Sequence, residues 1–246
     1  MAIIETKHLR KVFGDKVALD DLNLAVEEGE IFAFLGPNGA GKTTTIKILA
    51  GLLRPTSGCA SIAGHDLATD GLQARTLISY VPDEPFLYEK LTAREFLRLI
   101  GELYRMPPDK LEARIDDVMR LFELSEFIDH LTEGYSHGMK QRTVIAAALL
   151  HEPRVLVIDE PMVGLDPRSV RKVKDTLNEL SRNQKMTVFM STHTLSMAEE
   201  SADRIGILNN GKLIAVGTLP EIKAYCLSAT GQDKERLEDI FLHLTA

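Results

Sequence analysis

GPNGAGKTT, residues 36–44, is the stretch that fixes the fold class of this chain. The apolar run IFAFL, residues 31–35, precedes it, and TTTIKILAGLL, residues 43–53, follows with apolar side chains at helical spacing. Strand, glycine-rich turn and helix in this order match the pattern G-x-x-x-x-G-K-[ST]. Glycines let successive backbone N–H groups converge on phosphate oxygens, and the helix N-terminus adds its positive end. The stretch predicts a phosphate-binding loop within an α/β fold.

The loop supplies candidate ligands for a nucleoside triphosphate and its Mg²⁺. Lys42 brings a positive charge to the β- and γ-phosphates, and Thr43 offers a hydroxyl to the metal. The candidate nucleotide-binding residues are Gly36, Pro37, Asn38, Gly39, Ala40, Gly41, Lys42, Thr43 and Thr44.

VLVIDEP, residues 155–161, places two carboxylates at the end of a second apolar strand. Asp159 is a candidate Mg²⁺ ligand, and Glu160 a candidate general base for an attacking water. Carboxylates that only cap the following turn are the alternative. His193 directly follows the strand TVFMST, residues 187–192, at the sheet edge where open α/β folds bind ligands. It is a candidate γ-phosphate contact, with a structural histidine as the alternative.

YSHGMKQR, residues 135–142, indicates a second anion site. Ser136 and Gly138 stand at the start of a helix that continues into the apolar TVIAAALL. A plain N-cap is the alternative function of Ser136. The chain thus has two anion sites but a single Asp–Glu pair.

The remaining pattern gives the organisation. IIETKHL and LNLAV, residues 3–9 and 22–26, read as strands. From residue 91 to 150 the pattern is helical, with a capping box at Thr92 and Glu95 and a helix opened by PPDK. An Asn-Gly turn at 210–211 predicts a hairpin. We expect an α/β core interrupted by a helical insert.

Composition excludes several classes of protein. The 246 residues carry a formal net charge of -7, which disfavours a nucleic-acid partner held by bulk electrostatics. The two cysteines, Cys59 and Cys226, form neither a metal spacing nor a disulfide framework, and we expect both to be packing residues. No apolar run approaches the about 20 residues that span a bilayer, and the N-terminus does not read as a signal peptide.

These motifs, in this order, resemble those of the ATP-binding cassette (ABC) ATPases over nearly the whole chain. GPNGAGKTT is similar to their Walker A loop, VLVIDE to Walker B, YSHGMKQR to the signature sequence, and GLDP, residues 164–167, to the D-loop. The resemblance implies a P-loop NTPase (RecA-like) core in residues 1–88 and 152–220 with an N-terminal antiparallel β subdomain. It also implies an inserted helical subdomain, 89–151, completing a cassette domain of 1–220, and a short C-terminal extension, 221–246.

The resemblance further implies ATP and Mg²⁺ as ligands and ATP hydrolysis as the reaction, with Lys42, Glu160 and His193 as catalytic residues. In the family two cassettes meet head to tail, so Ser136 and Gly138 would close the site of a second copy, and Asp166 would cross the interface. Phe13 fits the aromatic residue that stacks on adenine, with hydrophobic packing as the alternative.

Two positions depart from the family pattern. Asp83, in YVPDEP, stands where the family usually has a glutamine that contacts Mg²⁺ and the attacking water. We therefore expect Thr43, Asp83 and Asp159 as metal ligands and slow hydrolysis. His137 replaces the first glycine of the usual signature pair.

The family's transporters bind a membrane partner through the region that here reads PFLYEKLTAREFLRLIGELYR, residues 85–105. Its aromatic residues belong either to the core, as we expect for Phe96, or to a docking groove.

The tail DKERLEDIFLHLT resembles export-type cassettes. We predict the ATPase subunit of an exporter, at the cytoplasmic face of the cell membrane, bound to an integral membrane permease on a separate chain and to a second copy of itself. The alternatives are a soluble cassette acting on ribosomes or DNA, and an ATP-gated module without turnover. The residues do not indicate the cargo.

Overall fold

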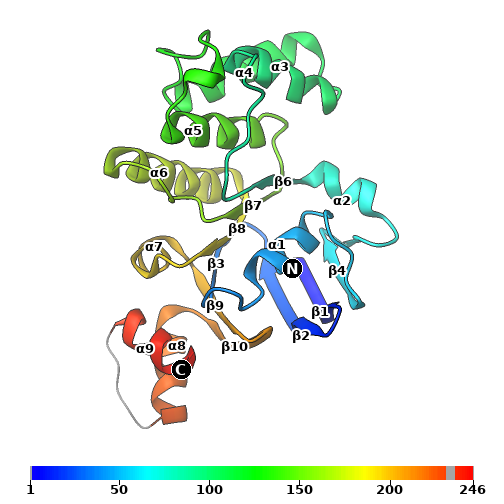
Figure 1. Cartoon of the computed structure of the whole chain (residues 1–246), viewed down its shortest axis with the longest axis vertical. Coiled ribbons are helices and arrows are strands. Elements are labelled where there is room, and N and C mark those ends of the chain that lie inside the picture. Colours follow the sequence, from blue (N-terminus) through cyan, green and yellow to red (C-terminus); the bar gives the residue numbers. More distant parts are fainter. Residues whose placement is uncertain (1, 231–235, 246) are drawn as a thin grey trace.

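The computed structural model describes residues 2–230 and 236–245. It contains a four-stranded sheet in the order β2-β1-β4-β5 and a six-stranded sheet in the order β10-β9-β3-β8-β7-β6 (Figure 1). The strands are β1 (Ala2–Phe13), β2 (Lys16–Glu27), β3 (Ile31–Leu35), β4 (Ser57–Ile62), β5 (His65–Asp66), β6 (Ile78–Val81), β7 (Val155–Asp159), β8 (Thr187–Thr192), β9 (Arg204–Asn209) and β10 (Lys212–Gly217). The helices are α1 (Lys42–Leu49), α2 (Gly71–Leu77), α3 (Ala93–Leu103), α4 (Pro108–Leu121), α5 (His137–Ala148), α6 (Pro167–Gln184), α7 (Leu195–Ser201), α8 (Leu219–Thr230) and α9 (Leu237–Thr245), with a 3-10 turn η1 (Thr132–Gly134).

The six-stranded sheet is buried on both faces, which explains why its strands are continuous apolar runs. Alternate residues of β3 enter different hydrophobic clusters. Ile31, Ala33 and Leu35 face one cluster, and Phe32 and Phe34 face the other. The first cluster includes residues of α5, α6 and α7, and the second includes residues of α1 and the antiparallel sheet. The sheet is therefore the middle layer of the core.

The carboxyl ends of the central parallel strands reach one edge of this sheet. Leu35 of β3 pairs with Thr192 of β8, and Asp159 of β7 pairs with Ser191 of β8. β6 lies beside β7, also in parallel. Because the pairing is parallel and in register, the segments that follow β3, β6, β7 and β8 begin at the same edge. The predicted loop, carboxylates and histidine are all in these segments.

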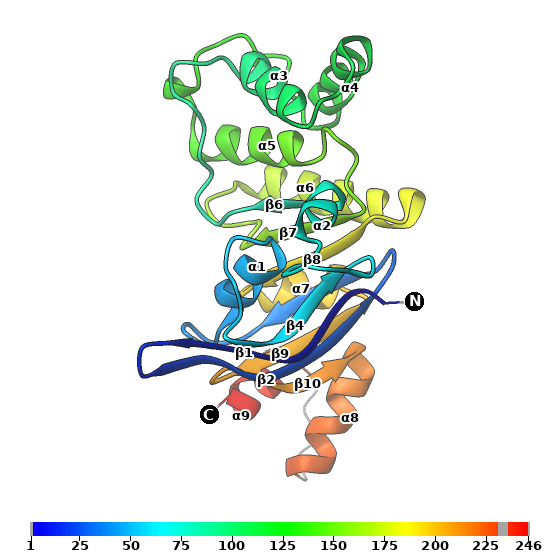
Figure 2. The ribbon, with the colours of Figure 1, turned by 90° about the vertical axis from the view of Figure 1, so that its right-hand side faces the viewer.

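Helices α3, α4 and α5 form a group between β6 and β7 in the chain and lie at one end of the molecule (Figures 1 and 2). The predicted capping box is present: Thr92 accepts from the backbone of Glu95, whose side chain bonds the backbone of Thr92. Pro108 opens α4, as the PPDK pattern predicted. Helices α8 and α9 lie at the opposite end. Residues 233–235, the start of the tail predicted to be export-like, lie outside the described residues.

The aromatic and cysteine side chains singled out in the sequence differ in burial. Phe96 is buried, as expected, whereas Phe86 and Tyr88 are 70% and 52% exposed. Cys226 is buried, but the packing function expected for Cys59 is wrong, because this side chain is exposed on β4. Across residues 2–230 and 236–245, every helix is too short or too polar to cross a membrane.

Candidate functional site

A cavity of about 320 Å³ surrounds the loop between β3 and α1. It is lined by Phe13, Lys16, Ala18, Asn38, Gly39, Gly41, Lys42, Thr43, Thr44, Asp83, Asp159 and Glu160. The structure thus brings together the glycine loop, the Asp–Glu pair and Asp83, which are far apart in the sequence.

Two glycines of the loop are required by the fold itself. Gly41 has φ 114°, and a Cβ there would lie 2.6 Å from the carbonyl oxygen of Ala18. A Cβ on Gly36 would lie 2.5 Å from the carbonyl oxygen of Leu208. Neither position can accept a side chain without movement of the backbone. These close approaches fix the loop against β2 and β9.

The ammonium group of Lys42 is folded back onto the loop. Its Nζ donates to the carbonyl oxygens of Gly36, at 2.6 Å, and Pro37, at 3.2 Å. Burial lowers the pKa of Lys42, while the carboxylates of Glu160 and Asp159 act in the opposite direction. A buried cation whose hydrogen bonds within the described residues go to neutral carbonyls is well prepared to bind phosphate oxygens.

Asp159 is buried at the end of β7, and its two carboxylate oxygens differ. Oδ1 accepts a hydrogen bond from the hydroxyl of Ser191. Oδ2 has no hydrogen-bond partner among the described residues. Thr43 and Asp83 line the same cavity as Asp159. An unsatisfied buried carboxylate oxygen in a cavity with these oxygen donors fits a hard cation such as Mg²⁺.

This set of oxygen donors is typical of a Mg²⁺ ion that binds together with a phosphate-bearing substrate. Within residues 2–230 and 236–245 no cluster of three or more His, Cys, Asp or Glu side chains could hold a metal by itself. Mg²⁺ needs no such cluster, because it usually keeps several waters and binds one or two carboxylates together with phosphate oxygens.

Glu160 and His193 are in direct contact. Nδ1 of His193 lies 2.8 Å from Oε2 of Glu160, and the backbone N–H of His193 donates to the same oxygen at 3.2 Å. The backbone N–H of Glu160 donates to the carbonyl oxygen of Ser191 at 3.1 Å. Glu160 therefore has three contacts with the end of β8 that hold its carboxylate beside the cavity.

Two residues near the site were not predicted from the sequence. Ser191 belongs to an apolar strand, and only the β7–β8 pairing places its hydroxyl against Asp159. Tyr80, on β6, lies close enough to the carboxylates to respond to their charge. Burial first, then the charges of Asp159 and Asp83, raise the pKa of Tyr80 to about 12. A polar side chain near the end of a buried strand was the available signal for both.

The family model described as ABC transporter matches residues 19–163, more than half of the chain. This chain belongs to the ABC transporter family. The daunorubicin resistance ATP-binding protein DrrA3 of Streptomyces coeruleorubidus is 39% identical over 224 residues, which are 91% of this chain and 69% of DrrA3. The probable multidrug ABC transporter ATP-binding protein YbhF of Escherichia coli and of Shigella flexneri is longer: it is 39% identical over 242 residues, which are 98% of this chain but 41% of YbhF.

Solved structures support the same family assignment. An ATP-binding subunit of an ABC transporter matches with a TM-score of 0.89 at 36% identity and covers 99% of this chain and 100% of that one. A dimer of the ATP-binding cassette MJ0796 in a post-hydrolysis state, bound to ADP and phosphate, matches with a TM-score of 0.80 at 29% identity, covering 88% and 98%. The predicted P-loop NTPase fold is confirmed, and the chain is an ATP-binding ABC ATPase.

Phe13 of this ABC cassette lies at the tip of the β1–β2 hairpin and lines the cavity. Its side chain is 47% exposed, and Nζ of Lys11 lies 4.9 Å from the ring centroid. Hydrophobic packing therefore does not account for this aromatic residue. A half-exposed ring that lines the cavity is available to a planar ligand.

The signature turn of the cassette lies apart from this cavity. Ser136 caps α5, where its hydroxyl accepts from the backbone N–H of Met139 at 3.3 Å. Asp166 caps α6 by accepting from the backbone N–H groups of Arg168 and Ser169. Among the described residues, Ser136, Gly138 and Asp166 are not part of the cavity lining. One cassette does not bring its two predicted anion sites together.

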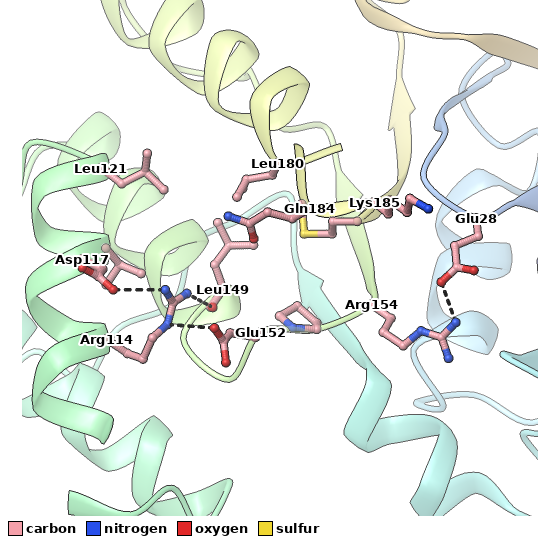
Figure 3. A pocket seen from close by; sticks show the side chains of 13 residues that line it. Glu28, Arg114, Asp117, Leu121, Leu149, Glu152, Arg154, Leu180, Gln184 and Lys185 are labelled. Carbon is pink, nitrogen blue, oxygen red and sulfur yellow. Dashed lines mark hydrogen bonds and ion pairs between the residues drawn. The ribbon is translucent and has the colours of Figure 1, made fainter. Parts of the chain in front are cut away.

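A second cavity of about 370 Å³ lies between α4, the end of α5 and the end of α6 (Figure 3). Two of its arginines already have partners: Arg114 donates to the carbonyl oxygen of Leu149 at 3.2 Å, and Arg154 donates to Glu28 at 2.6 Å. None of the predicted site residues lines it.

Proposed function

We propose that this cassette is the ATP-hydrolysing subunit of an exporter whose membrane-spanning subunit is a separate chain. The observation that carries the proposal is that the phosphate cavity and the signature turn lie apart within one cassette, since neither Ser136 nor Gly138 lines the cavity. Family membership supports the ATPase activity, and a relative named for daunorubicin resistance supports export. The proposal names no specific cargo, only a compound that such an exporter removes from the cell.

In the proposed reaction Lys42 binds the β- and γ-phosphates of ATP, and the loop N–H groups hold the remaining oxygens. Glu160 polarises the attacking water as general base, and His193 orients its carboxylate through the 2.8 Å contact. Phe13 stacks on the adenine ring. Each of these side chains lies in or beside the same cavity, or contacts a residue that does.

Mg²⁺ would be held by Thr43, Asp83 and Asp159, and would neutralise negative charge on the phosphates. The free Oδ2 of Asp159 supports this assignment. Asp83 adds a negative charge where the family usually has a neutral glutamine, and its side chain is one methylene shorter. We expect slower hydrolysis for this reason, without loss of Mg²⁺ binding.

Gly138 supports the proposal that a second copy completes the site. A Cβ at Gly138 would meet only Cδ2 of Leu165, at 3.7 Å, which is an ordinary contact. Its φ lies outside the left-handed region, and alanine is the better helix former for this second residue of α5. Nothing in the described part of the chain requires this glycine, so we infer that the space above it receives a phosphate from a partner cassette. Ser136 would bind the same phosphate.

The proposed membrane partner would dock beside Phe86 and Tyr88. These exposed rings meet edge to face, with centroids 5.7 Å apart, and line a hollow with Lys90 and Lys140. We propose that residues 89–151 form the helical subdomain, within a cassette domain of 1–220 followed by an extension of 221–246, and that this surface lies where the subdomain joins the core. The cassette would then lie at the cytoplasmic face of the membrane through its partner. Detergent co-purification tests this, because Phe86→Ala should lose an integral membrane protein that the wild type retains.

Mixing two inactive variants tests the shared ATP site. Lys42→Ala disables the phosphate loop, and Gly138→Asp disables the signature turn. Each variant alone should fail to form an ATP-dependent dimer. A mixed dimer contains one composite site with both parts intact, so differently tagged variants should associate when ATP is added. If the mixture associates no better than either variant alone, the head-to-tail arrangement is wrong.

A further inference from the structure

Two side chains of α5, one helical turn apart, contact the segment that follows Glu160. The ring nitrogen Nε2 of His137 lies 3.0 Å from the carbonyl oxygen of Val163. Nε2 of Gln141 donates to the carbonyl oxygen of Pro161 at 3.4 Å. Residues at positions i and i+4 share one helix face, so both contacts face the same turn.

The contact of His137 fixes its hydrogen-bonding role. A carbonyl oxygen only accepts, so Nε2 of His137 must carry the hydrogen and donate it. The imidazole also fills space that Gly164 leaves open. A Cβ on Gly164 would lie 2.5 Å from Cδ2 and 2.8 Å from Nε2 of His137, and Gly164 has φ +73°. His137 and Gly164 are therefore matched in shape.

The segment reached by His137 joins Glu160 to the D-loop. On one side lies Glu160, held by His193 and Ser191. On the other lies Asp166, which caps α6. Two hydrogen bonds thus connect the start of α5, which carries the turn at Ser136–Gly138, to the segment that follows Glu160. A glycine at position 137, as is usual in the family, could make neither the hydrogen bond nor the packing contact.

We propose that His137 is a positioning residue that couples the two ATP sites of a dimer. It ties the signature turn, which serves the partner's phosphate, to the segment beginning at Glu160, which serves the phosphate of its own chain. Phosphate binding at one site thereby sets the geometry of the other. The coupling rests on the proposed function, since it requires that the signature turn reaches a partner.

Three substitutions separate this coupling from a general structural effect. His137→Gln keeps an N–H donor at the ε position. His137→Glu has a side chain of the same size as glutamine but offers only acceptors to the carbonyl oxygen of Val163. His137→Ala removes the contact altogether. The side chain is exposed, so all three variants should fold, which thermal unfolding checks. The readouts are kcat, the Hill coefficient for ATP, and binding of a fluorescent ATP analogue to the monomer.

We expect His137→Gln to behave as the wild type. His137→Glu and His137→Ala should lower kcat about fivefold to thirtyfold, as expected for one lost hydrogen bond, and bring the Hill coefficient to about 1. Analogue binding to the monomer should change less than about twofold in all three, because the phosphate cavity does not include His137. Loss of kcat with unchanged monomer binding is not expected of a residue that only stabilises the fold.

A shape test accompanies the kinetic one. Gly164→Ala carries the same backbone strain in every background, but the clash with the imidazole disappears in His137→Gly. Gly164→Ala should therefore destabilise the wild type more than it destabilises His137→Gly.

The outcomes distinguish the two proposals. If the Lys42→Ala and Gly138→Asp mixture associates, but His137→Glu and His137→Ala keep wild-type kcat and cooperativity, the coupling by His137 is wrong while the shared site stands. The coupling is equally wrong if His137→Gln is as impaired as His137→Glu. If the mixture fails to associate, the shared site fails and the coupling with it.

Discussion

Oε2 of Glu160 accepts a hydrogen bond from the backbone N–H of His193 and lies 2.8 Å from Nδ1 of the His193 ring. The two residues follow neighbouring strands, β7 and β8, so the contact joins two strand ends across the sheet edge. Glu160 also has φ 50°, a left-handed conformation that a glutamate keeps only where its surroundings hold it. The carboxylate is therefore positioned before a nucleotide binds.

Glu160→Gln should lower ATP turnover by about 10²- to 10⁴-fold, because the amide cannot accept a proton from water. It can still accept the N–H of His193, so nucleotide binding should persist and an ATP-bound dimer should accumulate. Steady-state phosphate release and size-exclusion chromatography with ATP measure the two effects. Glu179→Gln, an exposed position on α6, is the matched control and should leave both unchanged. Wild-type turnover in Glu160→Gln would show that another group is the base.

Gly138→Ala should leave the free energy of unfolding unchanged or raise it by up to about 1 kcal/mol, since alanine favours the helix and meets no clash. ATP-dependent dimer formation and hydrolysis should nevertheless fall by about 10²-fold, because the methyl group would occupy the place of the partner's phosphate.

Gly134→Ala is the matched control, since its Cβ would meet no clash either and the residue lies before the signature turn. Denaturant unfolding and turnover measured on both variants test the assignment. Equal turnover in the two variants would contradict a ligand above Gly138.

Phe13→Ala should weaken ATP binding about fivefold to a hundredfold, the loss typical of one aromatic–base stack. The fold should not change, because the ring is half-exposed. Val17→Ala removes an exposed apolar side chain of the same hairpin that does not line the cavity, and should bind ATP normally. Titration with a fluorescent ATP analogue compares them, and Phe13→Trp should restore affinity. Equal ATP affinity in Phe13→Ala and the wild type would show that Phe13 does not contribute to ATP binding.

His151 predicts a specific pH dependence of stability. Its ring stacks on Tyr104 with centroids 3.6 Å apart, and burial lowers its pKa from 6.5 to about 4. As pH falls below 6.5, His151 binds a proton in the unfolded chain, whereas in the folded chain it binds one only near pH 4. The free energy of unfolding should thus fall between these pH values, by at most about 3 kcal/mol from this residue.

His151→Phe keeps the ring stack and removes the titrating nitrogen, so it should flatten this part of the stability profile. Urea unfolding at pH 7 and pH 5 measures the difference. His243→Phe, at an exposed position on α9, should keep the wild-type profile. An unchanged slope in His151→Phe would assign the pH dependence to other groups.

The amino-acid sequence was sufficient for the features that a single stretch of chain contains. The phosphate loop, the apolar strands β3, β7 and β8, the capping box at Thr92 and the Asn-Gly hairpin all depend on local sterics and on the spacing of apolar residues. These act between near neighbours and are readable without a structure. The short helices α2 and α7 were not predicted, because seven residues show too little periodicity.

Which distant residues meet depended on the tertiary structure. The contact of Ser191 with Asp159 follows from the pairing of β7 with β8, and the exposure of Phe13 follows from the path of the β1–β2 hairpin. The hydrogen bond from His137 to Val163 joins segments 26 residues apart. No local pattern encodes these contacts, because they depend on strand order and on the packing of α5 against the core, which many residues fix together.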